Sequence, residues 1–307
     1  MSSPEPCLGE NPLRAACYAD QACQTQVVIT ENIRLARDTY RVRFECPEMA
    51  RQISPGQFLM IRLTDRDDPL LARPFALYDT VVDTTGNPIG IDVVYLVVGK
   101  MTGRLAQCRL GDKLDVWGPL GNGFSSEPVR RLIMVAGGIG QTPFLALGRQ
   151  FLRGRDYGHN DGRNDDQQQS RREPASNVTL CYGVRTQDLL AGAEDFRECG
   201  IDLRISSDDG SVGHHGLVTE LLEQALAEDA EGDRRIACCG PEPMMEAVAA
   251  VAQRHNIRCE VSLETPMACG IGICFSCVVK TEQPDGDWDY KRTCVDGPVF
   301  DAEKIVW

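Results

Sequence analysis

Short runs that alternate apolar and polar residues fill the chain from residue 25 to about residue 118. Gly, Pro or Asp separates these runs, and a period of two residues is typical of strands with one buried face. The pattern predicts a helix near residues 102–108 and strands at residues 26–30, 40–46, 57–63, 74–79, 91–98 and 113–118. Strands at such spacing favour a small antiparallel β-barrel, which we assign to residues 25–128.

The pattern changes at Arg131, after which buried strands alternate with helices. Strands are predicted at residues 131–138, 177–183, 201–206 and 235–240, and helices at residues 142–153, 187–199, 217–228 and 243–255. This alternation predicts a doubly wound parallel α/β sheet with helices on both faces, over residues 129–260. The stretch 153–176 inside it is almost purely polar, cannot bury a core and is expected to be a disordered insertion.

The two ends of the chain differ from these domains. Residues 1–24 show no sustained period and are expected to form a flexible extension. Residues 261–307 hold four cysteines within 26 residues and are expected to form a small third unit. The predicted fold class is therefore α+β and multidomain, with an antiparallel β-barrel, a doubly wound parallel α/β domain and a small C-terminal subdomain.

Composition and charge narrow the function classes. A formal net charge of −13 at pH 7 argues against nucleic-acid binding, which needs a basic face, and against docking to an anionic membrane surface. No run approaches the roughly 18 to 20 apolar residues that span a bilayer, and the first residues lack the order of a signal peptide. We therefore expect a cytoplasmic protein whose 14 cysteines are thiols or metal ligands.

Four of the cysteines form a motif with metal-ligand spacing. Three follow the pattern C-x4-C-x2-C, and the fourth comes after sixteen intervening residues, which is the plant-type arrangement for a [2Fe–2S] cluster. Gly270 and Gly272 stand where a loop must curl around the cluster, and glycine permits the positive φ values that this requires. The alternatives are a structural zinc site, which usually takes C-x2-C pairs, and four unrelated thiols. The predicted cluster ligands are Cys269, Cys274, Cys277 and Cys294.

A glycine-rich turn follows the first predicted strand of the α/β domain. The run VAGGIGQTPF (135–144) places backbone amides at a helix N-terminus, where they can receive a diphosphate; a turn that needs glycine only for close packing is the alternative. The run CCGPEPMM (238–245) ends a later strand at the carboxyl edge of the sheet, where ligands of parallel sheets bind. Together they predict a nucleotide site formed by Gly137, Gly138, Gly140, Thr142, Pro143, Cys239, Gly240 and Pro241.

The barrel region carries two further candidates. The run RPFA (73–76) ends a predicted strand with a guanidinium that can pair with a flavin diphosphate. The run GPLGNGF (118–124) can form a tight turn into a cleft between the domains, with an ordinary loop as the alternative. No Ser–His–Asp set or carboxylate dyad stands out, so the chemistry is expected to belong to bound cofactors, with no catalytic side chain.

Taken in order, the RPFA, GPLGNGF, VAGGIGQTP, CGPEPMM and four-cysteine motifs resemble the ferredoxin–NADP reductase superfamily. Within it, MACGIGICFSCVVKT (267–281) followed by RTCVDGPVF (292–300) is similar to the electron-transfer subunit of class 1B dihydroorotate dehydrogenase. The resemblance covers about residues 25–307 outside the polar insertion. It implies an FAD-binding barrel, an NAD-binding domain and a [2Fe–2S] cluster subdomain.

The resemblance also implies which barrel residues contact FAD. They lie on two strands and a turn, and are Arg73, Pro74, Phe75, Ala76, Val94, Tyr95, Leu96, Met101 and Thr102. Three of them depart from the residues usual in the family. Ala76 replaces a hydroxyl residue, Leu96 replaces an arginine that is often present, and Met101 occupies the place of a glycine.

The activity that the resemblance implies is an electron relay in pyrimidine biosynthesis. Dihydroorotate reduces FMN on a separate catalytic subunit, electrons pass singly through the [2Fe–2S] cluster, and FAD delivers hydride to NAD⁺. This chain has neither the length nor the pattern for an added FMN barrel of about 250 residues. The implied partner is therefore an FMN-containing dihydroorotate dehydrogenase catalytic subunit, in a heterotetramer with two copies of each subunit.

Two alternatives to this activity stay open at the level of sequence. The same architecture resembles NAD(P)H-linked reductase subunits that exchange electrons with ferredoxin, with sulfide or polysulfide, or with a hydrogenase. A zinc-stabilised binding protein without redox turnover is a different class. The nucleotide is also undecided: the acidic segment 206–216 favours NAD, Arg185 argues for NADP, and the resemblance implies NAD.

Overall fold

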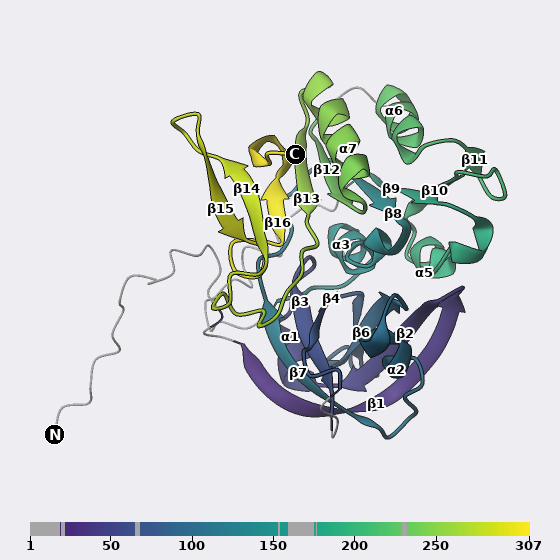
Figure 1. Cartoon of the computed structure of the whole chain (residues 1–307). Helices are drawn as coiled ribbons and strands as arrows, with labels where there is room; N and C mark the ends of the chain where they lie inside the picture. The colour runs from purple at the N-terminus through teal and green to yellow at the C-terminus, as the bar shows by residue number, and fades with distance from the viewer. Residues whose placement is uncertain are drawn as a thin grey trace.

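The computed structural model describes residues 19, 22–64, 68–152, 154–158, 175, 177–228 and 232–307. Most of the expected N-terminal extension and most of the expected polar insertion lie outside these described residues. No helix within the described part is long and apolar enough to cross a membrane. Three units follow one another along the chain: a curved sheet, a second sheet flanked by helices, and a small hairpin with its loops (Figure 1).

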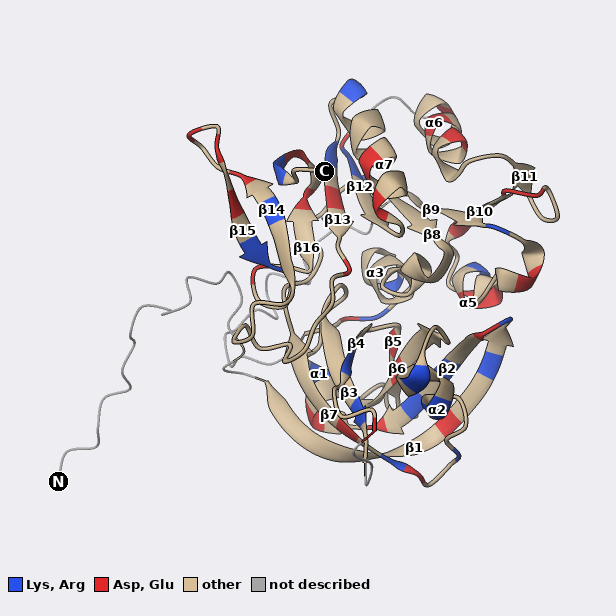
Figure 2. Ribbon diagram, in the orientation of Figure 1, with Lys and Arg blue, Asp and Glu red and all other residues tan. Residues whose placement is uncertain are grey.

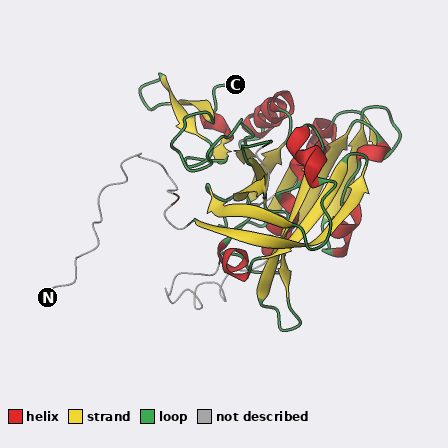
Figure 3. Ribbon diagram, turned by 60° about the horizontal axis from the view of Figure 1, so that its bottom comes forward, coloured by secondary structure: helices red, strands yellow, loops and turns green. Residues whose placement is uncertain are grey.

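The first unit is a seven-stranded antiparallel sheet that curves into a half-barrel (Figures 1 and 3). The order of its strands is β4-β3-β7-β1-β2-β6-β5. Because apolar and polar residues alternate, one face of each strand is buried, and Phe44, Ile61, Val93 and Val116 meet in the core. The elements are β1 (Cys23–Ala36), β2 (Thr39–Glu45), α1 (Pro47–Gln52), β3 (Phe58–Leu63), β4 (Arg73–Ala76), β5 (Asp79–Val82), β6 (Pro88–Leu96), α2 (Lys100–Leu105) and β7 (Lys113–Leu120).

The second unit is a mostly parallel sheet with the order β11-β10-β9-β8-β12-β13-β16. Phe144 and Phe196 from α3 and α5 pack on one face, while Leu222 and Val248 from α6 and α7 pack on the other. The elements are β8 (Arg131–Gly137), η2 (Gly138–Gln141), α3 (Phe144–Phe151), β9 (Asn177–Val184), η3 (Gln187–Leu189), α5 (Ala193–Glu198), β10 (Asp202–Ser207), β11 (His214–His215), α6 (Val218–Glu228), β12 (Arg234–Cys239), α7 (Glu242–Arg254) and β13 (Arg258–Ser262).

The third unit is an excursion of the chain between two neighbouring strands of this second sheet. After β13 a loop leads into the hairpin of β14 (Val278–Glu282) and β15 (Trp288–Arg292). The chain then returns as β16 (Val299–Asp301), which pairs antiparallel with β13, and continues into η4 (Ala302–Lys304). All four cysteines of the predicted cluster motif lie within this excursion.

The predicted fold class is confirmed, while two local predictions were wrong. The helix expected at 187–199 is broken into η3 and α5, because Gly192 between them has a left-handed backbone with φ of 68°. The strand expected at 74–79 is divided between β4, which pairs with β3, and β5, which pairs with β6. The chain bends between these two strands.

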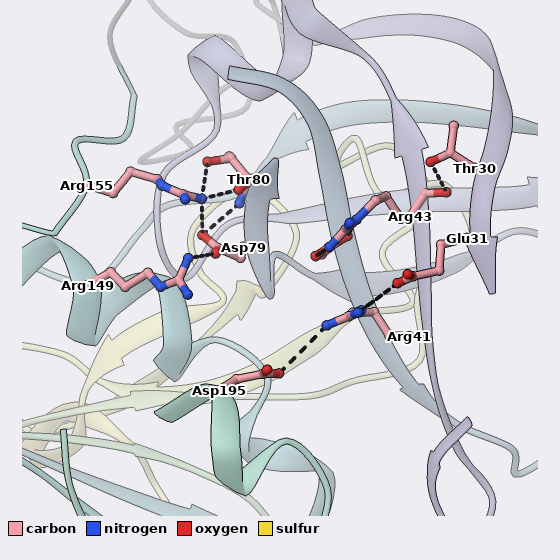
Figure 4. Close-up of polar contacts among 10 residues, drawn as sticks. Thr30, Glu31, Arg41, Arg43, Asp79, Thr80, Arg149, Arg155 and Asp195 are labelled. Carbon is pink, nitrogen blue, oxygen red and sulfur yellow. Dashed lines mark hydrogen bonds and ion pairs between the residues drawn. The ribbon is translucent and has the colours of Figure 1, made fainter. Parts of the chain in front are cut away.

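A buried carboxylate fastens the half-barrel to the α/β domain. Asp79, on β5, accepts hydrogen bonds from Arg149 on α3, from Arg155 at 3.0 Å and from the Tyr157 hydroxyl at 2.6 Å. Figure 4 shows both guanidinium groups converging on Asp79. Burial raises the pKa of Asp79, and the two arginines work against that rise. We call Asp79, Arg149, Arg155 and Tyr157 the Asp79 cluster.

A second contact between the same two domains lies nearby. Asp195, on α5, accepts a hydrogen bond of 2.6 Å from the Tyr78 hydroxyl, and its carboxylate stands 3.9 Å from the guanidinium of Arg41. Arg41 also pairs with Glu31 at 2.8 Å on the neighbouring strand (Figure 4). Charged and polar groups from both domains therefore fix the angle at which they meet.

Candidate functional site

A cavity of about 750 Å³ follows the carboxyl edge of the parallel sheet. Five of the eight residues predicted for the nucleotide line it: Gly137, Gly138, Gly140, Gly240 and Pro241. Thr142 and Cys239 line the neighbouring cavity instead, and Pro143 is the residue before α3. Ligands of doubly wound sheets bind at this edge, so the cavity has the position expected of a nucleotide site.

The glycines of this turn have different roles. A Cβ atom on Gly140 would lie 2.3 Å from the Cys239 carbonyl oxygen, so close packing of two backbone segments requires glycine there. Gly138 has a φ of 55°, and a Cβ atom on it would meet nothing within 4 Å. The close-packing explanation therefore holds for Gly140, whereas Gly138 leaves backbone open to the cavity.

A second cavity, of about 470 Å³, lies between the half-barrel and the α/β domain. All nine residues that the resemblance assigned to FAD line it, and they come from β4, the end of β6 and the start of α2. Two sets of contacts fix residues in the wall of this cavity. Phe75 meets Tyr95 edge to face, with ring centroids 5.9 Å apart. The Thr102 hydroxyl oxygen accepts hydrogen bonds from the N–H groups of Val98 and Gly99. Arg73 is exposed at the rim.

The two cavities meet at a carboxylate. Leu96, Ile139 and Glu264 line both of them, and Glu264 also lines a third cavity beneath the β14–β15 hairpin. The Glu264 side chain is accessible through these cavities, yet protein surrounds it, and this burial raises its pKa. Nearby, burial also raises the pKa of Cys239, which is therefore a neutral thiol.

The four cysteines of the motif are arranged as two pairs on the loop before β14 and the turn after β15. The sulfur atoms of Cys277 and Cys294 are 3.2 Å apart and buried. Cys274, which is exposed, hydrogen-bonds with the half-buried Cys269. Among the described residues, no three His, Cys, Asp or Glu side chains form a site for a single metal ion. The cysteines in that part of the chain form no disulfide.

Two of these thiols are biased towards the thiolate, which is the form that binds metals. Burial opposes ionisation of Cys274, but hydrogen bonds from Ser276 outweigh it and lower the pKa of Cys274 to about 6. The hydrogen bond between Cys277 and Cys294 lowers the pKa of Cys277 to about 6 and raises the pKa of Cys294.

The loop backbone also suits a cluster. Gly270 and Gly272 have φ values of 76° and 84°, in the left-handed region, as predicted for a loop that curls around its ligands. The N–H of Ile271 donates to the Cys269 sulfur at 3.4 Å, and the backbone of Gly272 hydrogen-bonds to the Cys294 sulfur. Amides directed at thiolates, together with two close sulfur pairs, fit an iron–sulfur cluster.

A packed apolar layer joins the second cavity to the cysteines. Phe58 and Met267 line that cavity and also belong to one hydrophobic cluster with Cys277 and Cys294. We call this cluster without its two cysteines the Met267 layer. Its residues are Phe58, Met60, Ala72, Leu120, Met267 and Val295. The indole N–H of Trp117, on β7, donates to the Cys269 carbonyl at 3.1 Å and fixes the loop against the half-barrel.

Sequence motifs did not single out Glu264 or Phe58, and they included Met267 only as the first residue of the run 267–281, without a role of its own. Glu264 lies two residues after β13 and could have been found from its place at the carboxyl edge of the parallel sheet. Phe58 and Met267 carry no such signal, because an apolar residue on a strand or loop is ordinary core material.

Comparisons with known proteins agree with this geometry. The iron–sulfur cluster binding domain of dihydroorotate dehydrogenase B matches residues 264–306, an oxidoreductase FAD-binding domain matches residues 26–124, and an oxidoreductase NAD-binding domain matches residues 134–250. The order of the three matches along the chain is the order of the three units in the fold.

Curated relatives match nearly end to end. The electron transfer subunit of dihydroorotate dehydrogenase B (NAD(+)) from Caldanaerobacter subterraneus subsp. tengcongensis is 32% identical over 279 residues, which is 91% of this chain and 97% of the relative. The protein of the same name from Bacillus caldolyticus is 34% identical over 275 residues, covering 89% and 94%.

Solved structures share the fold. In a structure of an NADH-dependent reduced ferredoxin-NADP oxidoreductase, described for flavin-based electron bifurcation, one chain is 28% identical with a TM-score of 0.73, and the match covers 92% of this chain and 90% of that one. A ferredoxin reductase of carbazole 1,9a-dioxygenase, at 20% identity and a TM-score of 0.60, shares the fold alone.

Proposed function

Because the chain belongs to the family of electron-transfer subunits of dihydroorotate dehydrogenase B, we propose that it carries electrons from an FMN-containing dihydroorotate dehydrogenase catalytic subunit to NAD⁺ in pyrimidine biosynthesis. In this proposal a [2Fe–2S] cluster handles single electrons and FAD exchanges hydride with the nicotinamide. The chain is an oxidoreductase subunit whose own side chains bind, orient and shield the cofactors.

One observation carries the proposal: the three predicted cofactor regions form a continuous path. The nucleotide cavity meets the flavin cavity at Leu96, Ile139 and Glu264. The Met267 layer then connects the flavin cavity to the buried pair Cys277 and Cys294. This order suits a relay that begins at a partner beside the cysteines and ends at the nicotinamide.

The cysteine pairs support the proposed cluster type. In a [2Fe–2S] cluster with four cysteine ligands, each of the two irons takes two sulfurs. We assign Cys269 and Cys274 to one iron and Cys277 and Cys294 to the other, following their spacing in the fold. Cys274 is the exposed member, so the first iron is proposed to face the partner.

The surface around the cluster loop suits an apolar partner. Residues 267–278 contain no Lys, Arg, Asp or Glu, and this part of the loop is tan in Figure 2. Large apolar side chains stand exposed on the loop and on the adjacent hairpin, which is unusual for a free surface. They are Ile273, Phe275, Trp288 and Tyr290. We propose that they dock the catalytic subunit, in a cytoplasmic heterotetramer with two copies of each chain.

We propose NAD as the nucleotide. Arg185 and Asp208 both line the nucleotide cavity, on the loops after β9 and β10. A carboxylate at the adenosine end repels the 2′-phosphate that distinguishes NADP, whereas an arginine attracts it. Replacing Asp208 by Asn should therefore improve kcat/KM for NADPH more than for NADH, and an equal effect on both would remove Asp208 as the discriminating group.

A second candidate function is a reductase subunit that exchanges electrons between NAD(P)H and ferredoxin. The observation that favours it is the 28% identity, over 92% of this chain, to one chain of the NADH-dependent reduced ferredoxin-NADP oxidoreductase. Partners that handle sulfide, polysulfide or hydrogen would use the same cofactors and belong to this second candidate.

The deciding experiment is reconstitution. The purified chain is first reduced anaerobically with NADH while the flavin and cluster absorbance is recorded. A dihydroorotate dehydrogenase catalytic subunit, dihydroorotate and NAD⁺ are then added, and the appearance of NADH is followed. Dihydroorotate-dependent NADH formation supports the first candidate. Bleaching by NADH without dihydroorotate turnover, combined with ferredoxin reduction, moves the assignment to the second.

The matched control for this experiment is Cys274→Ser. It should lose most of the iron–sulfur absorbance and the turnover with dihydroorotate, while FAD stays bound, because Cys274 lies outside the flavin cavity. A colourless wild-type protein containing zinc would contradict both redox candidates.

A further inference from the structure

Arg292, the last residue of β15, is buried directly behind the cysteine loop. Its side chain is 7% exposed, and its guanidinium donates a hydrogen bond of 3.0 Å to the Gly272 carbonyl oxygen. The guanidinium also lies 5.0 Å from the centre of the Phe275 ring. One cation thus contacts two residues of the loop segment that joins Cys269 to Cys277.

Gly272 is the residue through which Arg292 reaches the ligands. Its carbonyl accepts from Arg292, while its own backbone hydrogen-bonds to the Cys294 sulfur. Its φ of 84° is a left-handed conformation that the loop has to maintain. Arg292 therefore holds a peptide segment that links the first half of the motif to the fourth ligand.

The charge of Arg292 lies close to that of Asp296. The Asp296 carboxylate stands 3.5 Å from the guanidinium and also accepts a hydrogen bond of 2.9 Å from the Arg292 backbone N–H. Both side chains are under a tenth exposed, so water screens neither charge well. Because residues 267–278 are uncharged, this buried pair supplies fixed charges of both signs behind the loop.

We propose that Arg292 is a positioning residue for the iron–sulfur cluster, and that its buried positive charge raises the reduction potential of the cluster. The inference rests on the proposed cluster at Cys269, Cys274, Cys277 and Cys294. Reduction adds a negative charge to the cluster, and cluster potentials depend on nearby charge and on hydrogen bonds to sulfur. The positive charge of Arg292 at this place favours the reduced form of the cluster. The negative charge of Asp296 opposes this effect and lowers the potential.

The experiment measures the cluster directly in the full chain with its cofactors bound. Four variants are compared with the wild type: Arg292→Gln, Arg292→Lys, Asp296→Asn and Lys291→Gln. Lys291 is the matched control, since it is the preceding residue of β15, points to the other side of the strand and loses the same charge. Readouts are iron and sulfide content, the EPR spectrum of the reduced cluster and its midpoint potential.

We expect Arg292→Gln to shift the midpoint potential downwards and to change the EPR spectrum, and Asp296→Asn to shift the potential upwards. Arg292→Lys should return the potential most of the way to the wild-type value while leaving the EPR spectrum altered, because lysine keeps the charge without the planar fork. Lys291→Gln should shift the potential much less than Arg292→Gln.

Equal shifts in Arg292→Gln and Lys291→Gln, or an unchanged potential in Asp296→Asn, would overturn the inference. If Arg292→Gln fails to assemble a cluster, the midpoint potentials of Asp296→Asn and Arg292→Lys test the inference. An upward shift in Asp296→Asn and a potential near the wild-type value in Arg292→Lys would support it, and an unchanged potential in Asp296→Asn would overturn it. Failure of the proposed cluster is distinguishable, because it would show as a wild-type chain without iron and sulfide before any variant is compared. Failure of the proposed partner would show in the reconstitution with dihydroorotate and leaves these potentials measurable.

Discussion

The half-barrel has two junctions, and they are built from different chemistry. Towards the α/β domain it offers the buried carboxylate of Asp79 to Arg149 and Arg155. Towards the cluster loop it offers apolar side chains and backbone contacts, such as Met60 against Gly270 and the Trp117 indole on the Cys269 carbonyl. The first junction adds this buried charge cluster to aromatic contacts such as Phe124 with Phe144, whereas the second depends on the volume of a few apolar side chains.

This difference suits what each junction has to do. A charged cluster fixes an angle between two domains and tolerates little rotation, because each ion needs its partner. Tight apolar packing keeps water out of the layer between the second cavity and the buried cysteines Cys277 and Cys294. The two junctions should consequently fail under different substitutions.

The largest effect is expected at the charged junction. Asp79→Asn removes the carboxylate that two largely buried arginines share. Burial by itself opposes ionisation of Asp79, but unlike Glu264 this carboxylate compensates buried cations, and loss of one partner of a buried ion pair costs about 3–5 kcal/mol. Urea unfolding followed by fluorescence should show this loss of free energy of unfolding. The control is Asp68→Asn, in the exposed pair with Lys100, which should change stability little. Similar losses in both variants would contradict a special role for Asp79.

The second largest effect is expected at the apolar junction, where the addition of one methyl group to Gly270 should lower stability. A Cβ atom on Gly270 would lie 2.5 Å from Met60 Cγ, at a φ of 76°, so Gly270→Ala combines overpacking with a left-handed backbone and should cost about 2–4 kcal/mol. Gly286 has a φ of 85°, and a Cβ atom on it would meet nothing within 4 Å, so Gly286→Ala isolates the backbone part. Iron content and unfolding free energy should fall further in Gly270→Ala. Equal losses would show that packing on Met60 is unimportant.

A smaller effect is expected from the indole hydrogen bond. Trp117→Phe removes the donor to the Cys269 carbonyl and should cost about 1 kcal/mol, with faster loss of the cluster in the presence of a chelator. Trp288→Phe is the control, since that indole lies on the exposed hairpin. If chelation proceeds at the same rate in both variants, the Trp117 bond does not protect the loop.

The smallest effect concerns the carboxylate at which the cavities meet. Burial raises the pKa of Glu264 above its unfolded value, so its ionisation opposes folding and stability falls as the pH rises through the raised pKa. Glu264→Gln should therefore be more stable than the wild type at pH 8, with the difference vanishing near pH 4. Thermal unfolding across this range measures it, with the exposed Glu282→Gln as the control. A difference that does not depend on pH would rule out this ionisation as its cause.

Local patterns in the sequence predicted the three units of this fold, but they could not predict which residues of different units contact one another. Alternation of apolar residues marked the strands of the half-barrel, and the cysteine spacing marked the loop, because both are set by neighbours along the chain. The Asp79 cluster joins residues 70 to 78 positions apart, and nothing near Asp79 in sequence announces Arg149 or Arg155.

The same limit applies within the candidate site. The nine residues that resemblance assigned to FAD come together around one cavity, but they were recognised as motifs and not by their geometry. Glu264 follows a strand that carries no motif, and its importance arises only where three cavities meet. Gly192 shows the reverse case, since a single glycine inside a helical pattern was a local signal for a break.

The return of the chain through β16 has a consequence for how the protein is made. β16 follows every other strand of the second sheet along the chain, and it covers the edge of β13. During synthesis that edge stays bare until Val299–Asp301 has left the ribosome, by which time all four cysteines have emerged. Completion of the sheet therefore follows the emergence of all four cysteines, so a chain that stops just short of β16 holds every cysteine of the motif but leaves the edge of β13 unpaired.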